Sequence, residues 1–441
     1  MTVSDVIIDR LMARHPKGFD LSLGRVERLL HALGDPHLRL PPVIHVAGTN
    51  GKGSTVAFMR AILEASGRRV HTHTSPHLVR FNERYRMATR PGRSAFVDDA
   101  RFADALMRAE AANADQPITV FEILTAAGFL LFSESPADIA LIEVGLGGRF
   151  DATNVIPSPL VAVITQIGLD HEAYLGDRVE KIAFEKAGIM KPGRPVVVSP
   201  PTDEVRAVFE AEAARVGASL IVGGQDFAAH EEHGRLVYQD GGGLMDLPPP
   251  RLPGRHQFSN AATAVAALRA SGLSLGLADY QRGMQEVEWP ARLQRLLSGR
   301  LLDAAPAGAE IWLDGGHNPN AGEALATAMA EIEERAPRPL FLVVGMLKTK
   351  DPIGFFRPFQ GLAKHVFAVP IPQSDAAREP EELAAAARSA GLFAEKSANV
   401  AAAIRNITWI SRGSAFPPRI LICGSLYLAG EVLAENGTPP A

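Results

Sequence analysis

The sequence predicts an α/β fold, in which an N-terminal P-loop domain with a mostly parallel sheet precedes a smaller, Rossmann-like C-terminal α/β domain. Three observations predict it. The 441 residues exceed what one hydrophobic core usually organises. Short β-branched runs alternate with longer, alanine-rich amphipathic runs, which is typical of an open sheet covered by helices. A glycine-rich turn joins the first of these runs to the first long helix between them.

The N-terminal domain contains four β-branched runs that predict buried parallel strands, at residues 43–46, 139–144, 160–165 and 195–199. Between them, the amphipathic runs 54–66 and 178–189 predict helices. Residues 223–253 contain a glycine triplet and a proline triplet, which predict a surface excursion or hairpin within this domain.

A second series of the same kind follows and has no fixed-period repeat, so it predicts a second α/β unit. Its expected strands are 311–313, 340–344, 364–369 and 419–423, and its expected helices are 321–335, 381–389 and 399–410. Pro380 suits a helix start, where a missing N–H is tolerated. We place the connection within residues 289–302 and the domains at 1–293 and 294–441.

Composition excludes several classes of protein. The content of 46% hydrophobic and 21% charged residues is ordinary for a soluble protein, and a net charge of -4 gives no reason to expect nucleic acid or membrane partners. The single cysteine, Cys423, excludes an internal disulfide. Asp5 and Asp9 interrupt any signal-peptide core, and the longest apolar stretch, 118–132, contains Glu122 and is too short to span a bilayer. We therefore expect a cytoplasmic protein.

The turn from Gly48 to Ser54 predicts a phosphate-binding loop. Glycines let backbone N–H groups converge on phosphate oxygens at the start of a helix, Lys52 adds a point charge, and Ser54 can contact phosphate or its metal. Val46 replaces the first glycine of the common P-loop pattern and Gly53 separates Lys52 from Ser54, which disfavours a standard GTPase or motor ATPase. The alternative is a glycine turn that merely joins a strand to a helix.

Polar residues after the later strands are candidates for a site, because ligands of open α/β sheets gather beyond the carboxyl ends of strands. Glu143 could hold magnesium, or it could be a buried glutamate paired with an arginine. Asp170 and His171 could be metal ligands or acid–base groups, although a lone histidine is more often structural. By periodicity alone Lys186 is a solvated helix lysine.

Three histidines, His71, His73 and His77, alternate in a way that resembles a metal cluster. They have no cysteine or H-x-x-x-H partner to complete a zinc site, so we do not expect zinc there.

Nine short motifs occur in a specific order: AGTNGKGS, TSPHLVRFNER, FEILT, EVGLGGRFDATN, DHEAYLG, EKAGI, GRHQFSN, ARLQ and DGGHNP. Together they resemble the folylpolyglutamate synthase/dihydrofolate synthase family, a branch of the Mur-type amide ligases. The resemblance runs from about Asp20 to Gly430. DHE and ARLQ are weak on their own, whereas GTNGKGS, EVGLGGRFDATN and DGGHNP in this order are specific.

The resemblance implies that the P-loop domain is an ATPase domain and that the chain is an ATP-dependent amide ligase. ATP would activate the carboxylate of dihydropteroate or a folate as an acyl phosphate. The amino group of L-glutamate would then attack, giving dihydrofolate or a folylpolyglutamate with ADP and phosphate. Two magnesium ions would assist, and a K+ requirement stays open. The expected partners are these small molecules, with no nucleic acid and no membrane, and the chain is expected to be a monomer.

The resemblance also assigns residues. Magnesium ligands match Ser75, Glu143, His171 and Lys186, the last as a lysine that carries CO2 as a carbamate. ATP contacts match Gly48, Thr49, Asn50, Gly51, Lys52, Gly53, Ser54, Asn260, Arg292 and Asp314, with His317 beside them. Folate-binding positions match Leu23, Gly24, Arg25, Phe121, Glu122, Arg149 and Asp151. Lys52, His171 and Lys186 are expected to act in catalysis.

Four further expectations follow from the resemblance. ATP would bridge the two domains, and closure about residues 289–302 would assemble the site. Gly316 replaces the alanine that is commoner in the family, which predicts a looser loop there. The segment 90–97 is polar and irregular, and could alter access for the folate tail. The segments DLSLGRVER and FEILT look like those of bifunctional members, so we favour both activities.

Three alternatives compete with this interpretation. A Mur-type peptidoglycan-precursor ligase generally has a further domain before its ATPase domain, and little chain precedes Gly48 here. A P-loop GTPase or kinase is disfavoured by the offset of Ser54 and by the lack of a clear N-K-x-D motif. A protein that binds nucleotide without chemistry is disfavoured by the joint presence of Lys52, Glu143, His171 and Lys186.

Overall fold

The computed structural model describes residues 2–15, 22–372 and 374–441. Asp20, where the resemblance begins, lies outside them. The chain forms two compact units: unit 1 contains Met1–Gly168, Glu172–Arg251 and Gln257–Glu288, and unit 2 contains Leu169–His171, Leu252–His256 and Trp289–Ala441. The boundary at 293/294 stays a prediction.

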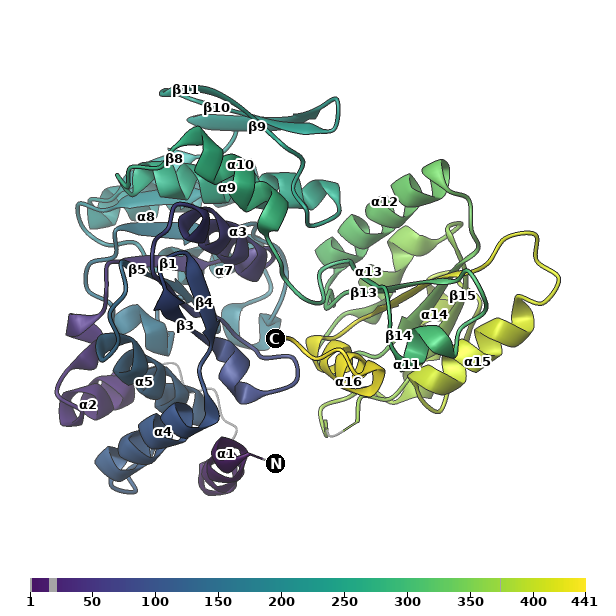
Figure 1. Cartoon of the computed structure of the whole chain (residues 1–441), viewed down its shortest axis with the longest axis horizontal. Coiled ribbons are helices and arrows are strands. Elements are labelled where there is room, and N and C mark those ends of the chain that lie inside the picture. The colour runs from purple at the N-terminus through teal and green to yellow at the C-terminus, as the bar shows by residue number, and fades with distance from the viewer. Residues whose placement is uncertain (1, 16–21, 373) are drawn as a thin grey trace. The chain divides into compact units, whose positions relative to one another are not determined.

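Unit 1 is built around an eight-stranded sheet in the order β4-β3-β2-β5-β1-β6-β7-β8 (Figure 1). Its strands are β1 (Val43–Ala47), β2 (Val70–His73), β3 (Tyr85–Arg90), β4 (Arg93–Phe96), β5 (Ile139–Glu143), β6 (Val161–Ile164), β7 (Pro195–Val198) and β8 (Ser219–Val222). The six strands β2, β5, β1, β6, β7 and β8 pair in parallel. The edge strands β3 and β4 pair antiparallel, β3 with β2 and β4 with β3.

The central strands β1 and β5 are buried along their whole length because both faces of the sheet are covered. Val43 and Ile142 join one hydrophobic cluster with α5 (Val120–Ser133), and Ala47 and Ile164 join another that includes residues of α7 (Val179–Ala187) and α8 (Asp203–Val216). The intervening Ile44 is equally buried and faces the other way, since side chains alternate along a strand. The four parallel strands and the two helices expected in this domain are confirmed.

The remaining helices of unit 1 enclose this sheet. They are α1 (Val3–Arg14), α2 (Gly24–Ala32), α3 (Lys52–Ala65), α4 (Asp99–Asn113), α6 (Glu172–Leu175), α9 (Arg255–Ala270) and α10 (Leu277–Glu286), with short 3-10 turns at Pro36–Arg39, Phe81–Arg84 and Ala152–Val155. Helix α3 packs against β1, β2 and β5 and against α10. The first two residues of α9 belong to unit 2.

Two segments of unit 1 test the expectations for irregular structure. Residues 223–253 contain an antiparallel three-stranded sheet, β9 (Phe227–Glu232), β10 (Arg235–Asp240) and β11 (Gly243–Leu247), so the expected hairpin is confirmed. The expectation of irregular structure at 90–97 is wrong for 93–96, which form β4. There, pairing with β3 overrides the polar composition.

Unit 2 contains a six-stranded sheet in the order β12-β13-β17-β14-β15-β16 (Figure 1). Its strands are β12 (Gln294–Leu296), β13 (Glu310–Leu313), β14 (Leu340–Val344), β15 (Ala363–Ala368), β16 (Ala394–Lys396) and β17 (Arg419–Cys423), and only β12 is antiparallel. Its helices are α11 (Arg300–Asp303), α12 (Pro319–Arg335), α13 (Pro352–Phe356), α14 (Pro380–Ser389), α15 (Val400–Ile410) and α16 (Leu426–Asn436), with a 3-10 turn at Arg357–Phe359. The expected Rossmann-like pattern and the helix start at Pro380 are confirmed.

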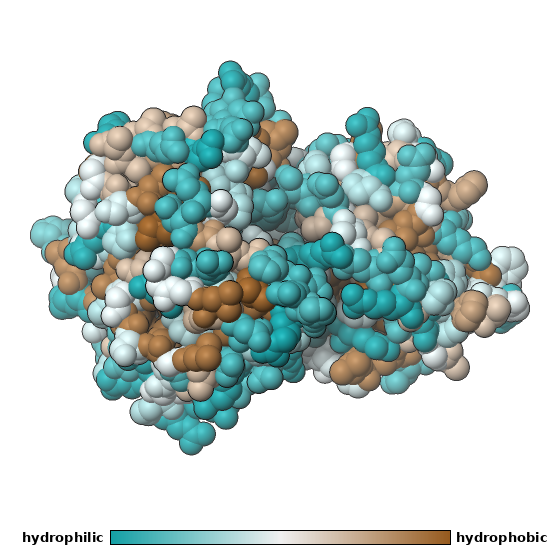
Figure 2. All heavy atoms as spheres, turned by 90° about the horizontal axis from the view of Figure 1, so that it is seen from above, coloured by the Kyte–Doolittle hydropathy of each residue, from teal (hydrophilic) through white to brown (hydrophobic). Residues whose placement is uncertain are grey.

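The surface in Figure 2 mixes hydrophilic residues with scattered apolar patches. Among the described residues no helix is long and apolar enough to cross a membrane.

His45, His71 and His73 are buried inside unit 1, and two of them, His45 and His73, flank one residue of β5. His45 on β1 and His73 on β2 both lie opposite Ile142 of β5, so they flank it on the same face of the sheet. His45 Nε2 lies 2.9 Å from Thr153 Oγ1, whereas both ring nitrogens of His73 lack a hydrogen-bond partner. Burial, with Lys191 and His73 nearby for His45 and Arg84 for His73, lowers the pKa of each imidazole to about 3. Both rings are therefore neutral in the folded protein at neutral pH.

These histidines predict acid destabilisation of unit 1. The unfolded chain takes up a proton at each imidazole near pH 6.5 and the folded chain does not, so stability falls as the pH drops through that value. The loss is about 2 kcal/mol per histidine at pH 5 relative to pH 7. We expect His73→Leu to flatten the pH dependence of the urea-unfolding free energy by this amount. The exposed His31 provides the control, because His31→Leu should keep the wild-type slope; an unchanged slope in His73→Leu contradicts the prediction.

Candidate nucleotide and folate site

The loop between β1 and α3 is a turn of backbone that only glycine adopts readily. Gly48 has φ +148° and Gly51 has φ +86°, and Gly51 is the N-cap of α3 without a side-chain cap. A Cβ at Gly48 would lie 1.8 Å from Thr165 Oγ1, and one at Gly51 would lie 2.2 Å from Asn260 Oδ1. The α3 N-terminus therefore presents backbone N–H groups as an anion site requires.

The segment that follows β6 fixes this loop. The Gln166 carbonyl accepts the N–H groups of Thr49, at 2.9 Å, and Asn50, at 3.2 Å. The Thr165 hydroxyl donates to the Asn50 carbonyl at 2.7 Å, and Thr49 Oγ1 and the Gly168 backbone exchange two hydrogen bonds of 3.1 Å. Sequence reasoning missed Thr165 and Gln166. Their position at the end of a strand predicted to neighbour the loop was the available signal.

Asn260 on α9 lies against the loop, and its expected role as an ATP contact stays a prediction. Its side chain is 7% exposed, lies against Gly51, and donates from Nδ2 to Gln257 Oε1 at 3.0 Å. Ser54 on α3 is also buried.

Two lysines converge on one carbonyl oxygen of the loop. Lys52 Nζ donates to the Gly48 carbonyl at 3.0 Å and to the Thr49 carbonyl at 3.2 Å, and Lys186 Nζ donates to the same Gly48 carbonyl at 2.9 Å. Lys186 is only 5% exposed, so its interpretation as a solvated helix lysine is wrong. Helix periodicity could not reveal this, because it does not specify what packs on each face.

Glu143 and Ser75 lie together in unit 1. Glu143 ends β5, opposite Val46 of β1, and is 4% exposed. The Ser75 backbone N–H donates to Glu143 Oε2 at 3.3 Å. The described residues contain no group of three or more histidine, cysteine, aspartate or glutamate side chains that could hold a metal. Glu143 with Ser75 still fits magnesium, which keeps several waters and needs only one or two carboxylates besides substrate phosphates.

His171 belongs to unit 2, whereas the other expected magnesium ligands belong to unit 1, so its place among them stays a prediction. Its backbone has φ +53° and its side chain is 42% exposed.

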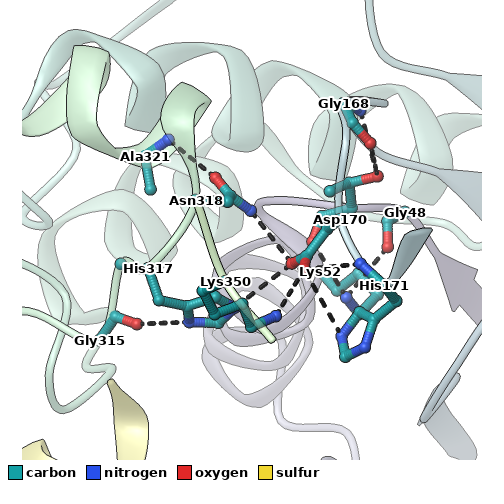
Figure 3. Close-up of polar contacts among 12 residues, drawn as sticks. Gly48, Lys52, Gly168, Asp170, His171, Gly315, His317, Asn318, Ala321 and Lys350 are labelled. Atoms are coloured by element: carbon teal, nitrogen blue, oxygen red, sulfur yellow. Dashed lines mark hydrogen bonds and ion pairs between the residues drawn. The ribbon is translucent and has the colours of Figure 1, made fainter. Parts of the chain in front are cut away.

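Asp170, beside His171, is the centre of a polar cluster in unit 2 (Figure 3). Its carboxylate accepts hydrogen bonds from Lys350 Nζ and Asn318 Nδ2, the latter at 3.2 Å, and lies 3.3 Å from His317 Nε2. Burial raises the pKa of this carboxyl, but the hydrogen bond and charge of His317 and the charge of Lys350 hold the pKa well below its usual range.

Sequence reasoning missed two residues of this cluster. Lys350 follows β14 at the carboxyl edge of the sheet, where a lysine is a candidate ligand by the same rule that selected Asp170. Asn318 is the N-cap of α12, where its Oδ1 accepts the Ala321 N–H at 2.9 Å. Both are at least nine-tenths buried.

Asp314 and its neighbours form the turn after β13. The Asp314 carboxylate accepts the N–H groups of Leu293 and Gly316, at 2.8 and 2.6 Å. The Gly316 carbonyl accepts the Gly424 N–H at 2.9 Å, and His317 Nδ1 lies 2.9 Å from the Gly315 carbonyl. The turn is therefore pinned on both sides of Gly316, and the expectation of a looser loop there is wrong.

The expected folate residues form a group in unit 1. Arg25, on the first turn of α2 after Leu23 and Gly24, makes a two-point ion pair with Glu122, with Nε–Oε2 at 3.2 Å and a second N–O distance of 3.1 Å. Glu122 also accepts the N–H and hydroxyl of Thr119, which caps α5.

The loop after β5 lies beside this pair. A Cβ at Gly145 would lie 2.3 Å from the Phe121 ring, so the missing side chain leaves room for the aromatic residue. Asp151 is buried and accepts the Leu146 N–H at 2.9 Å and both the N–H and the hydroxyl of Thr153, at 3.0 and 2.6 Å. Burial raises the pKa of Asp151 against these hydrogen bonds. In this structure Asp151 holds the loop, and a contact with substrate stays a prediction.

Arg149, another expected folate residue, contacts Phe184 and Glu212. Its guanidinium donates to Glu212 Oε1 at 2.7 Å and to the Phe184 carbonyl at 3.1 Å, and stacks on the Phe184 ring at 4.1 Å. These contacts fix the loop against α7 and α8, and substrate binding by Arg149 stays a prediction.

Two family models match the chain. The Mur ligase middle domain matches residues 46–268, and the Mur ligase glutamate ligase domain matches residues 299–426. The chain is 34% identical to the folylpolyglutamate synthase of Lacticaseibacillus casei over 420 residues, which cover 92% of each protein.

The chain belongs to the folylpolyglutamate synthase/dihydrofolate synthase family.

The chain is also 34% identical to a dihydrofolate synthase/folylpolyglutamate synthase of Escherichia coli. The match covers 359 residues, which are 81% of this chain and 79% of that protein. Solved structures of the family also match this chain along nearly its whole length. E. coli FolC in complex with DHPP and ADP superimposes with a TM-score of 0.85 and 30% identity over 98% of this chain and 97% of that one. The Mycobacterium tuberculosis folylpolyglutamate synthase complexed with ADP matches with a TM-score of 0.87 and 31% sequence identity, over 100% of this chain and 99% of that one.

A further family structure contains a metal. A bifunctional folylpolyglutamate synthase/dihydrofolate synthase with Mn, AMPPNP and L-glutamate bound matches with a TM-score of 0.82 and 30% identity, over 98% of each chain.

Thr165 provides a test of the loop geometry. We expect Thr165→Val to weaken ADP binding about fivefold to tenfold, because it removes the hydrogen bond that holds the Asn50 carbonyl. Isothermal titration measures this. The control is Thr408→Val, which removes a similar bond to the Ile404 carbonyl on α15. Equal ADP affinities in both variants and the wild type contradict a role for Thr165.

Proposed function

We propose that this chain is an ATP-dependent ligase that joins L-glutamate to dihydropteroate and to folates through an acyl phosphate. The observation that carries the proposal is the convergence of Lys52 and Lys186 on the Gly48 carbonyl of the phosphate loop. That geometry places two cationic side chains at the loop that precedes α3, and Glu143 ends β5, the strand that pairs with β1. The chain spans most of the length of the relatives named above, one a folylpolyglutamate synthase and the other a dihydrofolate synthase/folylpolyglutamate synthase.

The phosphate loop binds the phosphates of ATP through its backbone N–H groups. When ATP binds, the Lys52 ammonium leaves two neutral carbonyl acceptors and donates to charged phosphate oxygens. Hydrogen bonds to a charged acceptor are stronger, so this exchange favours binding. The substrate carboxylate attacks the γ-phosphorus, ADP leaves, and the amino group of glutamate then displaces phosphate from the acyl phosphate. Positioning and charge stabilisation supply most of the catalysis in such transfers.

A divalent metal would be held by Ser75 and Glu143, joined by His171 and by Lys186 as a carbamate. Magnesium, when bound, neutralises charge on the phosphates and on the transition state. A second magnesium site and a K+ requirement stay predictions of the resemblance.

The carbamate on Lys186 is supported by the electrostatics of the loop. Lys52 and Lys186 donate to the same carbonyl, and Lys186 is only 5% exposed, so a carbamate at Lys186 would face Lys52 as an opposite charge where an ammonium would face it as a like charge. A neutral amine reacts with CO2 to give a carbamate and a proton. The product is an anion next to Lys52, which turns repulsion into attraction and supplies a hard oxygen ligand for magnesium.

The group around Phe121 and the Arg25–Glu122 ion pair is proposed to bind the pterin end of the substrate. Its apolar ring and buried charges offer both a stacking surface and hydrogen bonds. In unit 2, Arg292, Asp314 and His317 are proposed to serve the nucleotide. We also propose that the chain has both activities and works as a monomer.

A Mur-type peptidoglycan-precursor ligase is not favoured, because the chain matches 92% and 79% of the length of two relatives that are folylpolyglutamate or dihydrofolate synthases. The deciding assay measures ADP and amide product with ATP, glutamate and either dihydropteroate or tetrahydrofolate. Product with both substrates supports bifunctionality and product with one supports a single activity. Turnover of a UDP-sugar peptide instead of either contradicts the proposal.

Lys186→Ala should nearly abolish ligation, because it removes the proposed carboxylate ligand. Acetate or formate added at high concentration should restore part of the rate measured by ADP release. Lys181→Ala is the matched control, since Lys181 lies on the same helix and is exposed. Rescue by a small amine in place of a carboxylate would contradict the carbamate.

Lys52→Ala should lower ATP turnover at least several-hundred-fold, as expected for a charge contact of about 3–4 kcal/mol in a water-poor site. Steady-state ADP formation measures this. The control is Lys364→Ala in unit 2, whose ammonium lies over the Phe341 ring. Turnover equal to that of the wild type would remove the loop lysine from the mechanism.

A further inference from the structure

A chain of three buried polar side chains connects β1 to the loop after β5. His45 Nε2 lies 2.9 Å from Thr153 Oγ1, and Thr153 Oγ1 lies 2.6 Å from Asp151 Oδ1. The exposed fraction is 0% for His45 and Thr153 and 4% for Asp151. Because all three groups are removed from solvent, their hydrogen bonds must be satisfied inside the protein.

The single proton of the Thr153 hydroxyl sets the direction of both hydrogen bonds. Asp151 Oδ1 also accepts the Thr153 N–H at 3.0 Å, and Asp151 Oδ2 accepts the Leu146 N–H at 2.9 Å, which favours an ionised carboxylate. The hydroxyl therefore donates its proton to Asp151, and its oxygen is left to accept the N–H of His45 Nε2.

His45 is consequently held in one tautomer. With the proton on Nε2, the Nδ1 atom carries none, and within the described part of the chain Nδ1 has no hydrogen-bond partner. Burial, with Lys191 and His73 nearby, lowers the pKa of the ring to about 3, so the imidazole stays neutral. His45 is therefore a fixed N–H donor near neutral pH and not an acid–base group. An apolar residue of similar size would fill the space but would leave the Thr153 oxygen without a donor.

Asp151, at the other end of the chain, fixes the loop that the expected folate residues share. Its bond to the Leu146 N–H closes the segment 146–151, and Asp151 is also the N-cap of the 3-10 turn Ala152–Val155. The loop is packed closely: a Cβ at Gly148 would lie 2.9 Å from two carbonyl oxygens of α7, and one at Gly145 would lie 2.3 Å from the Phe121 ring. A shift of Asp151 would therefore disturb the loop where it meets Phe121.

From these contacts we infer that His45 is a positioning residue for the pterin end of the substrate, because its Nε2–H, relayed by the Thr153 hydroxyl, orients Asp151 and the loop from 145 to 151. The inference rests on the proposed function, since the pterin site is part of it. His45 is fully buried and contacts no substrate itself. Without its N–H, the fraction of molecules with a competent loop falls, and apparent affinity for the pteridine substrate falls by the same factor.

The first experiment measures steady-state constants for ATP and for the pteridine substrate. We expect His45→Leu to raise the KM for the pteridine substrate about fivefold to tenfold, as for the loss of one buried hydrogen bond. The KM for ATP and kcat should change less than twofold. His45→Gln should return the pteridine KM to within twofold of the wild type, because the glutamine amide can supply an N–H at the same place.

His73→Leu is the matched control. It removes an equally buried ring from the other side of Ile142, but both ring nitrogens of His73 lack a hydrogen-bond partner. Its pteridine KM should equal that of the wild type. An unchanged pteridine KM in His45→Leu, an equal rise in the KM for ATP, or no rescue by His45→Gln overturns the inference.

A second experiment asks whether His45 acts through Thr153. Thr153→Val alone should raise the pteridine KM by a factor similar to that of His45→Leu, and in the Thr153→Val background His45→Leu should add less than twofold. Additive effects of the two substitutions overturn the inference. The Thr153→Val variant also covers the case in which His45→Leu does not fold, since an unchanged pteridine KM in Thr153→Val is equally decisive against it.

A third measurement needs no substrate. The ring nitrogens of His45 can be observed by NMR in protein labelled with 15N-histidine and assigned by their loss in His45→Gln. We expect the proton on Nε2 at neutral pH, and a proton on Nδ1 overturns the inference. This readout is separate from ligation: wild-type protein with the Nε2–H tautomer that forms no amide contradicts the proposed function, whereas ligation by protein with the Nδ1–H tautomer contradicts only the role of His45.

Discussion

The parallel pairing of β5, β1 and β6 is the constraint on which the phosphate site depends. Val46 lies opposite Glu143 on one side and Val163 on the other, so the three carboxyl ends meet at one edge of the sheet. The loop that leaves β1 then receives its hydrogen bonds from the residues that leave β6, and its neighbour on the other side is a buried carboxylate. A slip of one residue in this register would turn these groups to the wrong face.

In both units, lysine side chains donate hydrogen bonds to oxygen atoms of the same unit. In unit 1 a neutral carbonyl, that of Gly48, accepts hydrogen bonds from two lysines. In unit 2 the carboxylate of Asp170 accepts hydrogen bonds from Lys350 and Asn318 and lies beside His317. Buried cationic groups need such internal partners, because an uncompensated charge in a low dielectric is costly. The internal partners also define where an anionic ligand can replace them.

Backbone strain marks positions in unit 2 that short-range preferences would not choose. Ala291, Leu293 and His171 all have positive φ. The first two flank Arg292, an expected ATP contact, and His171 is itself an expected magnesium ligand. The conformation at Ala291 and Leu293 is imposed by hydrogen bonds from Asp314 and the Gly315 region, which are distant in sequence. The strain is therefore a property of the assembled unit and not of the local segment.

The sequence by itself determined the α/β class, four of the parallel strands in each sheet and the phosphate loop, whereas it missed the parallel strands β2, β8 and β16. Continuous β-branched runs and glycines at fixed offsets are local properties, and they carry that information directly. The tertiary structure alone decided the burial of Lys186, the hairpin of β3 and β4, the support of the loop by Thr165 and Gln166, and the cluster around Asp170 with Lys350. Each of these depends on which distant segment packs against a residue, and no periodicity within a single helix or strand records that partner.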